Sequence, residues 1–252
     1  MKSILDKISV LYEDGDILVI NKPAGLVAHA DGKREEPALT DWVESNYPAS
    51  KGVGEPITLG NAEVIERVIE RSGIVHRIDR ETSGVMLVAK NQEAFICLKK
   101  QFQNREIEKI YHTFVWGEMK DDEGIINRPI GRSKRDFRQW SAQRGARGVM
   151  REAITYYKVI TKKGGFSFVE VMPKTGRTHQ IRVHFKAINH PIVSDSLYAP
   201  KKEKGLGFER LALHSYSIEL GLLGGKQIKV EAPYPDDFKK AFEKVDVIIG
   251  PT

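Results

Sequence analysis

The sequence contains one cysteine, Cys97, among 252 residues. A single cysteine cannot form an internal disulfide, and this absence fits a reducing compartment. Ala94, Phe95, Leu98 and Phe102 recur around it at helical spacing. We therefore expect Cys97 to flank a packed helix face rather than to act as a nucleophile.

Patterns that bind metals or cross membranes are also missing. The seven histidines have neither paired cysteines nor a His-Glu-x-x-His arrangement beside them, so no metal site is predicted. No apolar run approaches the roughly 18 residues of a membrane span, and Asp6 and Lys7 stand where a signal peptide needs an apolar stretch. These absences predict a soluble cytoplasmic protein without membrane contact, and no obligate protein partner is evident.

Positive charge exceeds negative charge modestly, with a formal net charge of +6 and a pI of about 9.2. The excess is concentrated in residues 128–151, which hold eight Lys and Arg against one acid, Asp136, with Phe137 and Trp140 interleaved. Such cations and rings would pair with phosphates and stack on exposed bases of RNA. A solvated, mobile surface loop is the alternative. The cations that we expect on an RNA surface are Arg128, Arg132, Lys134, Arg135 and Arg138.

One carboxylate, Asp79, has an unusual setting within the stretch VHRIDRETSGVMLVAK. The pattern predicts a short apolar strand over 74–78, a Thr-Ser-Gly turn, and a buried strand over 85–89. Asp79 would then be presented by a loop between rigid elements, as reactive groups often are. A purely structural salt bridge to Arg77 or Arg80 is the alternative.

A second segment, PKTGRTHQIRVH at 173–184, has more cations than a packed core accepts. Residues 178–189 predict a helix with Ile181, Phe185 and Ile188 on one face, which leaves its Arg and His side chains to a cleft or to solvent. The preceding Lys-Thr-Gly resembles an anion-binding loop at a helix start. A basic, solvated helix end is the alternative, because helix N-termini bind anions without any catalytic purpose.

The order of predicted elements indicates an α+β fold with a largely antiparallel sheet. The length suits one catalytic domain over residues 1–252, or two intimately packed halves. The patterns predict strands at 9–12, 17–21, 211–220 and 227–232, a hairpin of 153–161 with 167–171, helices at 39–47, 92–104 and 237–245, and a linker over 48–60.

Together these segments resemble the RluA-like family of RNA pseudouridine synthases, whose signature around the catalytic aspartate reads close to His-Arg-Leu-Asp-x-x-Thr-Ser-Gly. The likeness extends over most of the chain: YEDGDILVINKPAG resembles the family's opening hairpin, KIYHTFVWG its tyrosine strand, and LALHSYSIEL with VEAPYP its closing strands. Ile78 stands where Leu is usual and Ala30 where Pro is common, which affects packing rather than chemistry.

The resemblance implies a long sheet bent around a central catalytic cleft, and a reaction that needs no cofactor. Because the opening hairpin starts near Ile8, the small RNA-binding domain that precedes the catalytic part in many relatives is expected to be absent.

The same resemblance implies an enzyme that flips a uridine out of RNA, breaks its glycosidic bond and rejoins the base through carbon 5. Asp79 would drive cleavage, either by adding to the sugar or by taking a proton from its 2′ position. Arg182 would be the cation that holds this negative charge inside a cleft. Tyr111 would stack on the base and take the proton from carbon 5, although a tyrosine on an apolar strand is more often a core residue.

Arg77 would fill the space left by the flipped nucleotide, unless it pairs structurally with Asp79. The other substrate contacts that we expect are His76, Arg80, Thr82, Lys174, Arg177 and His179. The predicted function is thus an RNA pseudouridine synthase acting on a stem-loop of ribosomal or transfer RNA. A catalytically inactive RNA-binding or RNA-chaperone protein is the alternative, and a glycoside hydrolase is weaker, since it usually needs two carboxylates roughly 5 to 10 Å apart.

Overall fold

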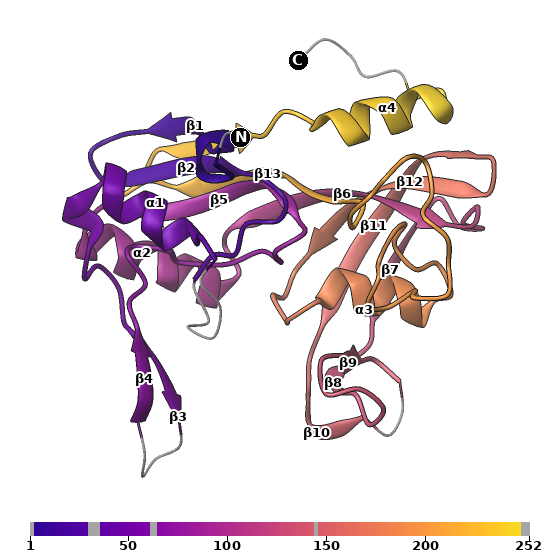
Figure 1. Ribbon diagram of the computed structural model, residues 1–252, viewed down its shortest axis with the longest axis horizontal. Coiled ribbons are helices and arrows are strands. Elements are labelled where there is room, and N and C mark those ends of the chain that lie inside the picture. Colours follow the sequence, from indigo (N-terminus) through magenta and orange to yellow (C-terminus); the bar gives the residue numbers. More distant parts are fainter. Residues whose placement is uncertain (1–2, 30–35, 61–64, 144–145, 248–252) are drawn as a thin grey trace. The chain divides into compact units, whose positions relative to one another are not determined.

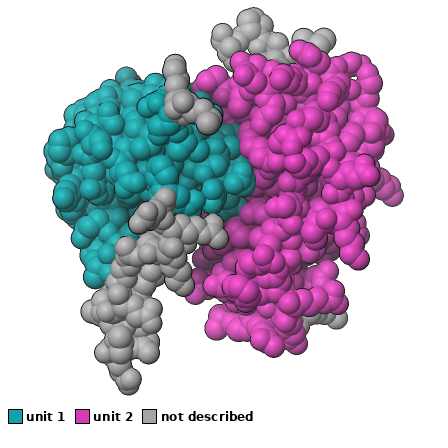
Figure 2. Space-filling view, viewed as in Figure 1, with its two compact units in different colours: residues 1–107, 217–232 teal, residues 108–216, 233–252 magenta. Residues whose placement is uncertain are grey.

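The computed structural model describes residues 3–29, 36–60, 65–143 and 146–247. They divide into two units, drawn in different colours in Figure 2. Unit 1 consists of Met1–Ile107 and Ser217–Ala232, and unit 2 of Glu108–Tyr216 and Pro233–Thr252. Strand β13 (Leu213–Gly221) begins in unit 2 and ends in unit 1. Arg144 and Ala30, which the sequence singled out, lie outside the described residues.

The sheet of unit 1 is built on two buried antiparallel strands. β2 (Ile17–Lys22) pairs with β5 (Ser83–Ala89), and every residue of β5 is buried. β1 (Ser9–Glu13) pairs with β2, and β14 (Gln227–Glu231) pairs with β13. A continuous apolar run such as that of β5 is what a strand covered on both faces requires.

Two helices and a hairpin complete unit 1 (Figure 1). α1 spans Leu39–Asn46 and α2 spans Gln92–Asn104. The Asn91 side chain accepts the N–H of Ala94 at 2.9 Å, which caps the start of α2. Ala94, Phe95 and Leu98 are buried against the sheet core, so the apolar face predicted around Cys97 is confirmed. β3 (Ile57–Gly60) and β4 (Ile65–Ile69) form a separate hairpin.

The sheet of unit 2 has the order β6-β12-β11-β7, all antiparallel. Its strands are β6 (Glu108–Trp116), β12 (Phe166–Pro173), β11 (Ile154–Lys163) and β7 (Glu123–Asn127). The predicted β11–β12 hairpin is confirmed. It turns at Gly164 and Gly165, whose positive φ angles of 62° and 79° suit a residue without a side chain.

Aromatic packing fixes the helices of unit 2. α4 (Asp236–Lys244) places Phe242 with its ring centroid 4.9 Å from Phe168 and 5.8 Å from Phe114. α3 (Gln180–Ala187) buries Ile181 and Phe185 in the same core. Below α3 in Figure 1 lies a small sheet of order β10-β8-β9, formed by Arg147–Arg151, Ile130–Arg132 and Trp140–Ser141.

The predicted fold class is confirmed as α+β. Nine strands hydrogen-bond in the order β1-β2-β5-β13-β6-β12-β11-β7, with β14 on β13. The pairings given above between strands of one unit are all antiparallel. Helices 92–104, 39–47 and 237–245 match α2, α1 and α4 to within one residue at each end.

Three local predictions are wrong. The linker 48–60 contains a 3₁₀ turn at Pro48–Ser50 and strand β3, whose short apolar stretch is concealed by nearby Pro and Gly. The strand over 74–78 does not form beyond a single bridge at Ile74, because the His76 ring takes the N–H of Leu87 that a ladder partner would use. The helix over 178–189 starts at Gln180, because His179 adopts a left-handed conformation with φ of 56°.

Within the described part of the chain, no helix has both the length and the apolar character needed to span a bilayer. The same residues contain no group of three or more His, Cys, Asp or Glu side chains placed to hold a metal ion.

Candidate active site

Asp79 occupies a tight turn that leads into β5. The N–H of Thr82 donates to the carbonyl of Asp79 at 3.1 Å and closes the turn. Gly84 follows with φ of 110°, a conformation that strongly favours glycine, so the turn enters a buried strand without steric conflict. Asp79 is half-buried, while Thr82 and Ser83 are buried. The prediction placed Asp79 between two rigid elements, and the structure has one of them, the buried strand β5 that follows the turn.

A buried lysine holds this turn in place. The Lys22 side chain is fully buried, and its Nζ donates to the carbonyls of Pro23 at 2.8 Å, Leu26 at 2.9 Å and Arg80 at 3.1 Å. The carbonyl of Arg80 also accepts the N–H of Gly25 at 2.8 Å. One ammonium therefore ties the Pro23–Leu26 loop to the residue after Asp79, and the sequence did not indicate this, since a lysine ending a strand is usually exposed.

The basic residues around Asp79 differ in their partners. Arg80 pairs with Glu36 at 3.0 Å and Glu81 at 3.6 Å, so it has acidic partners other than Asp79. His76 accepts from Leu87 through Nε2 at 3.0 Å and packs on Phe102. These contacts hold the His76 ring in place, and its role as a substrate contact stays a prediction of the sequence.

Arg77 and Thr82 differ in exposure. Arg77 is exposed and lies in a segment, 75–79, that forms no strand. The hydroxyl of Thr82 is buried and has no hydrogen-bond partner among the described residues.

His29 is a residue of the same unit that sequence reasoning missed. Burial first, and then the charges of Arg77 and Arg71, lower its pKa to about 4. Both ring nitrogens are buried and lack a partner among the described residues.

In unit 2, Arg182 is held by a buried carboxylate. Its Nε and Nη2 donate to Asp195 at 2.8 Å each, and the two side chains are 11% and 0% exposed. Asp195 also accepts the N–H groups of Leu197 and Tyr198 at 3.0 Å. The guanidinium lies 5.0 Å from the centre of the Tyr198 ring. Asp195 lies in a loop without any periodic pattern, and no signal in the sequence pointed to it.

Tyr111 lies on β6 opposite Val171 and packs against the core of unit 2 while staying partly exposed. Lys109 points to the same face, two residues earlier on the strand. Burial, followed by the charge of Lys174, lowers the pKa of Lys109 below its ordinary value. The face of β6 that carries Tyr111 therefore also carries the amine of Lys109.

The predicted anion-binding loop at 174–176 is not supported. The Thr175 hydroxyl donates to Gln180 at 2.7 Å and accepts from the N–H of Ile154 at 3.0 Å, so protein contacts use it. Lys174 is exposed and lies 4.0 Å from Glu108. Arg177 donates through Nε to the carbonyl of Glu152 at 2.9 Å. His179 contacts the Tyr198 hydroxyl at 2.9 Å, which brings it to the loop that holds Arg182.

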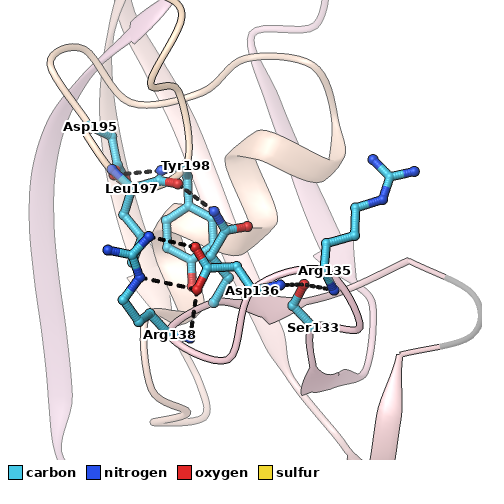
Figure 3. A network of polar contacts seen from close by, with 8 residues as sticks. Ser133, Arg135, Asp136, Arg138, Asp195, Leu197 and Tyr198 are labelled. Carbon is cyan, nitrogen blue, oxygen red and sulfur yellow. Dashed lines mark hydrogen bonds and ion pairs between the residues drawn. The ribbon is translucent and has the colours of Figure 1, made fainter.

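The five cations expected on an RNA surface all lie in unit 2 and are exposed, but three of them have partners in the protein. Arg128 donates to the last carbonyl of α3, at Ala187, at 2.8 Å. Arg132 stacks on Trp140 at 4.2 Å, and Arg138 forms an ion pair with Asp136 (Figure 3). The remaining two are Lys134 and Arg135, and Figure 3 shows the Arg135 side chain pointing away from the ion pair of Arg138 with Asp136.

The RNA pseudouridylate synthase family model matches residues 16–187, which include Asp79, Tyr111 and Arg182. This chain belongs to the RNA pseudouridylate synthase family. It is 34% identical to an uncharacterized RNA pseudouridine synthase of Bacillus subtilis, covering 94% of this chain and 73% of that protein. It is 32% identical to ribosomal large subunit pseudouridine synthase D of Borreliella burgdorferi, covering 92% and 67%.

These similarities confirm the RluA-like resemblance and the predicted enzyme class, an RNA pseudouridine synthase. Solved structures agree with the fold. Human RNA Pseudouridylate Synthase Domain Containing 4 has a TM-score of 0.73 at 23% identity, covering 96% of this chain and 95% of that one. The alternative of a catalytically inactive RNA-binding protein finds no support in these similarities.

Proposed function

We propose that this pseudouridine synthase acts on a structured segment of large-subunit ribosomal RNA, with Asp79, Tyr111 and Arg182 as its catalytic residues. The choice of ribosomal RNA is supported by two relatives named ribosomal large subunit pseudouridine synthase D, each 32% identical over more than nine tenths of this chain. Transfer RNA is the other class that the sequence predicts. A cytoplasmic location and action without an obligate protein partner remain predictions of the sequence.

The observation that carries the assignment of Asp79 is its locked turn. Glycosidic bond cleavage requires a carboxylate held within a fraction of an ångström of the sugar, because misplacement by about 1 Å can lower a rate 100-fold. The buried Lys22 ammonium and the buried strand β5 both fix the chain that follows Asp79, the first at Arg80 and the second from Ser83 onwards. The ionised carboxylate would then either add to the sugar or remove the 2′ proton.

Arg182 would stabilise the charge of Asp79. Its bidentate contact with Asp195 uses two of the five N–H donors of the guanidinium and fixes the plane of the group. A guanidinium held in one orientation suits a fixed catalytic position, and we therefore assign Arg182 to catalysis.

Tyr111 would stack on the target base and remove the proton from carbon 5. Deprotonation of a tyrosine is helped by nearby positive charge, and Lys109 lies on the same face of β6. Thr82 is the substrate contact that the structure favours most, because its buried hydroxyl has no partner among the described residues.

The test is pseudouridine mapping in total RNA from cells with the wild-type protein, without it, and with Asp79→Asn. We expect one or more ribosomal RNA sites to disappear in the last two. Glu81→Gln is the matched control, because it removes an exposed acid two residues away. Sites lost only from transfer RNA would redirect the proposal, and a site retained by Asp79→Asn would contradict it.

Tyr111→Phe tests the second role with purified protein and the mapped RNA. We expect RNA affinity to stay unchanged, because the ring remains, while product formation in a single turnover falls by about 100-fold, the usual scale of general base catalysis. Normal product release from Tyr111→Phe would remove the hydroxyl from the mechanism.

A further inference from the structure

The turn that joins β8 to β9, residues 133–139, carries the most exposed large apolar side chain among the described residues. We call it the Phe137 turn. Phe137 is 84% exposed. A single exposed ring on a protein surface needs no explanation in itself, so what the turn does with the ring depends on its surroundings.

The backbone on both sides of Phe137 is held by polar contacts. The Ser133 hydroxyl accepts the N–H groups of Arg135 at 3.2 Å and Asp136 at 3.4 Å. The N–H of Gln139 donates to the carbonyl of Asp136 at 3.0 Å. The carbonyl of Phe137 itself accepts from Arg132 at 3.2 Å. The ring is therefore presented by an ordered turn, and holding it in place on binding loses little conformational entropy.

Positive charge is in excess around the ring. The only acid of the turn, Asp136, is paired with Arg138, which donates to it through Nε at 3.1 Å and Nη2 at 2.8 Å. Lys134 and Arg135 are exposed next to it. A flat ring flanked by cations is the arrangement that binds unpaired nucleotides, since bases stack on the ring and phosphates pair with the cations.

The Phe137 turn is also tied to the loop that holds Arg182 (Figure 3). The Gln139 side chain donates to the carbonyl of Leu197 at 2.7 Å, and the N–H of Trp140 donates to the Tyr198 hydroxyl at 3.0 Å. Leu197 and Tyr198 donate in turn to Asp195, the partner of Arg182. Direct hydrogen bonds thus connect the exposed turn to the catalytic arginine within unit 2.

We propose that Phe137 stacks on an unpaired base of the RNA substrate other than the target uridine. Because the turn is fixed to the Asp195 loop, the stacked base is held at a set spacing from Arg182, and this spacing selects which uridine enters. The inference rests on the proposed function only in that RNA is the substrate. It names the substrate class as RNA with an unpaired nucleotide near the target.

The test measures binding of two fluorescein-labelled RNAs, a hairpin with an unpaired loop and a fully paired duplex containing the same stem. We expect Phe137→Ala to weaken hairpin binding by about 10-fold, the scale of one stacked base, and to leave duplex binding unchanged. Phe137→Trp should restore hairpin binding. Val149→Ala is the matched control, because Val149 is 81% exposed on β10 of the same small sheet.

Equal affinity of Phe137→Ala and wild type for the hairpin would overturn the inference, and so would an equal loss on the duplex. A lowered melting temperature of Phe137→Ala would show a structural role and would overturn it as well. Failure of the proposed function is seen separately: wild-type protein that binds the hairpin through Phe137 but forms no pseudouridine in any RNA retains the stacking site and loses the catalytic assignment.

Discussion

The turn that carries Asp79 and the side chain of Arg182 on α3 are each fixed by a buried charge, and the two charges have opposite signs. In unit 1 the Lys22 ammonium binds three backbone carbonyls, one of them next to Asp79. In unit 2 the Asp195 carboxylate binds the side chain of Arg182 itself, together with two backbone N–H groups. The first arrangement fixes a turn and the second fixes a functional group. The position of Asp79 in unit 1 therefore depends on how the backbone is held, and that of Arg182 in unit 2 on how its side chain is oriented.

The Phe137 turn differs from both of these sites, because its charged side chains are not fully buried. Its ion pair between Arg138 and Asp136 is reached by water, and most of the contacts that order the turn join side chains to its backbone. Buried charges position the catalytic groups, whereas the surface expected to bind RNA uses charges that water can still reach. Four predictions test this contrast, from the largest expected effect to the smallest.

Asp195→Ala should have the largest effect. It leaves a buried guanidinium without its carboxylate, and breaking a buried ion pair from one side costs about 3–5 kcal/mol of unfolding free energy. Urea denaturation measures this loss. Asp195→Asn keeps an acceptor oxygen and should fold better while turnover, and not RNA affinity, still falls. Full turnover in Asp195→Asn would show that orientation by charge is unnecessary.

His29 should make unit 1 sensitive to acid. Its pKa is lowered to about 4 in the folded protein, from 6.5 in an unfolded chain. The folded state therefore resists protonation, and the free energy of unfolding should fall by about 3 kcal/mol as pH drops from 6.5 through 4. His29→Gln should flatten this part of the pH profile. His184 of unit 2, whose pKa is also lowered by burial, acts in the same direction and is the natural comparison.

Lys22→Met should lower the free energy of unfolding by about 2 to 3 kcal/mol, because buried carbonyls lose a charged donor. Turnover should fall further, since the Asp79 turn is released. Lys51→Met, at an exposed lysine of unit 1, is the control and should change neither quantity. A variant at position 22 with normal turnover would show that β5 alone positions Asp79.

Arg138→Ala should have the smallest effect. The residue is exposed, and surface ion pairs contribute little to stability because water screens them. Thermal melting should be unchanged, and RNA affinity should fall with a weaker dependence on salt. A clear drop in melting temperature would show that the ion pair of the Phe137 turn stabilises the fold, as the buried charges do, and would contradict the comparison.

The sequence predicted the functional side chains better than the residues that hold them in place. Local residue patterns predict the Asp79 turn, the buried strand after it and the helix bearing Arg182, because each depends on the residue types and the apolar periodicity of a short stretch. Lys22 lies within the motif YEDGDILVINKPAG, but the sequence does not predict its burial, because a lysine at the end of an apolar strand has the same pattern whether its ammonium contacts water or carbonyls. The sequence predicts His76 as a substrate contact and does not indicate its hydrogen bond with Leu87, which only the structure shows.

The sequence by itself determined the family, the alternation of strands and helices, and the types of group available for chemistry, because periodicity, capping and turns depend on neighbours a few residues apart. Only the tertiary structure decided that Lys22 binds the carbonyl of Arg80, the residue after Asp79, across 58 residues of sequence. It likewise decided that Asp195 meets Arg182 from 13 residues away. Contacts of this kind depend on how the folded chain brings distant residues together, and patterns of neighbouring residues do not predict that.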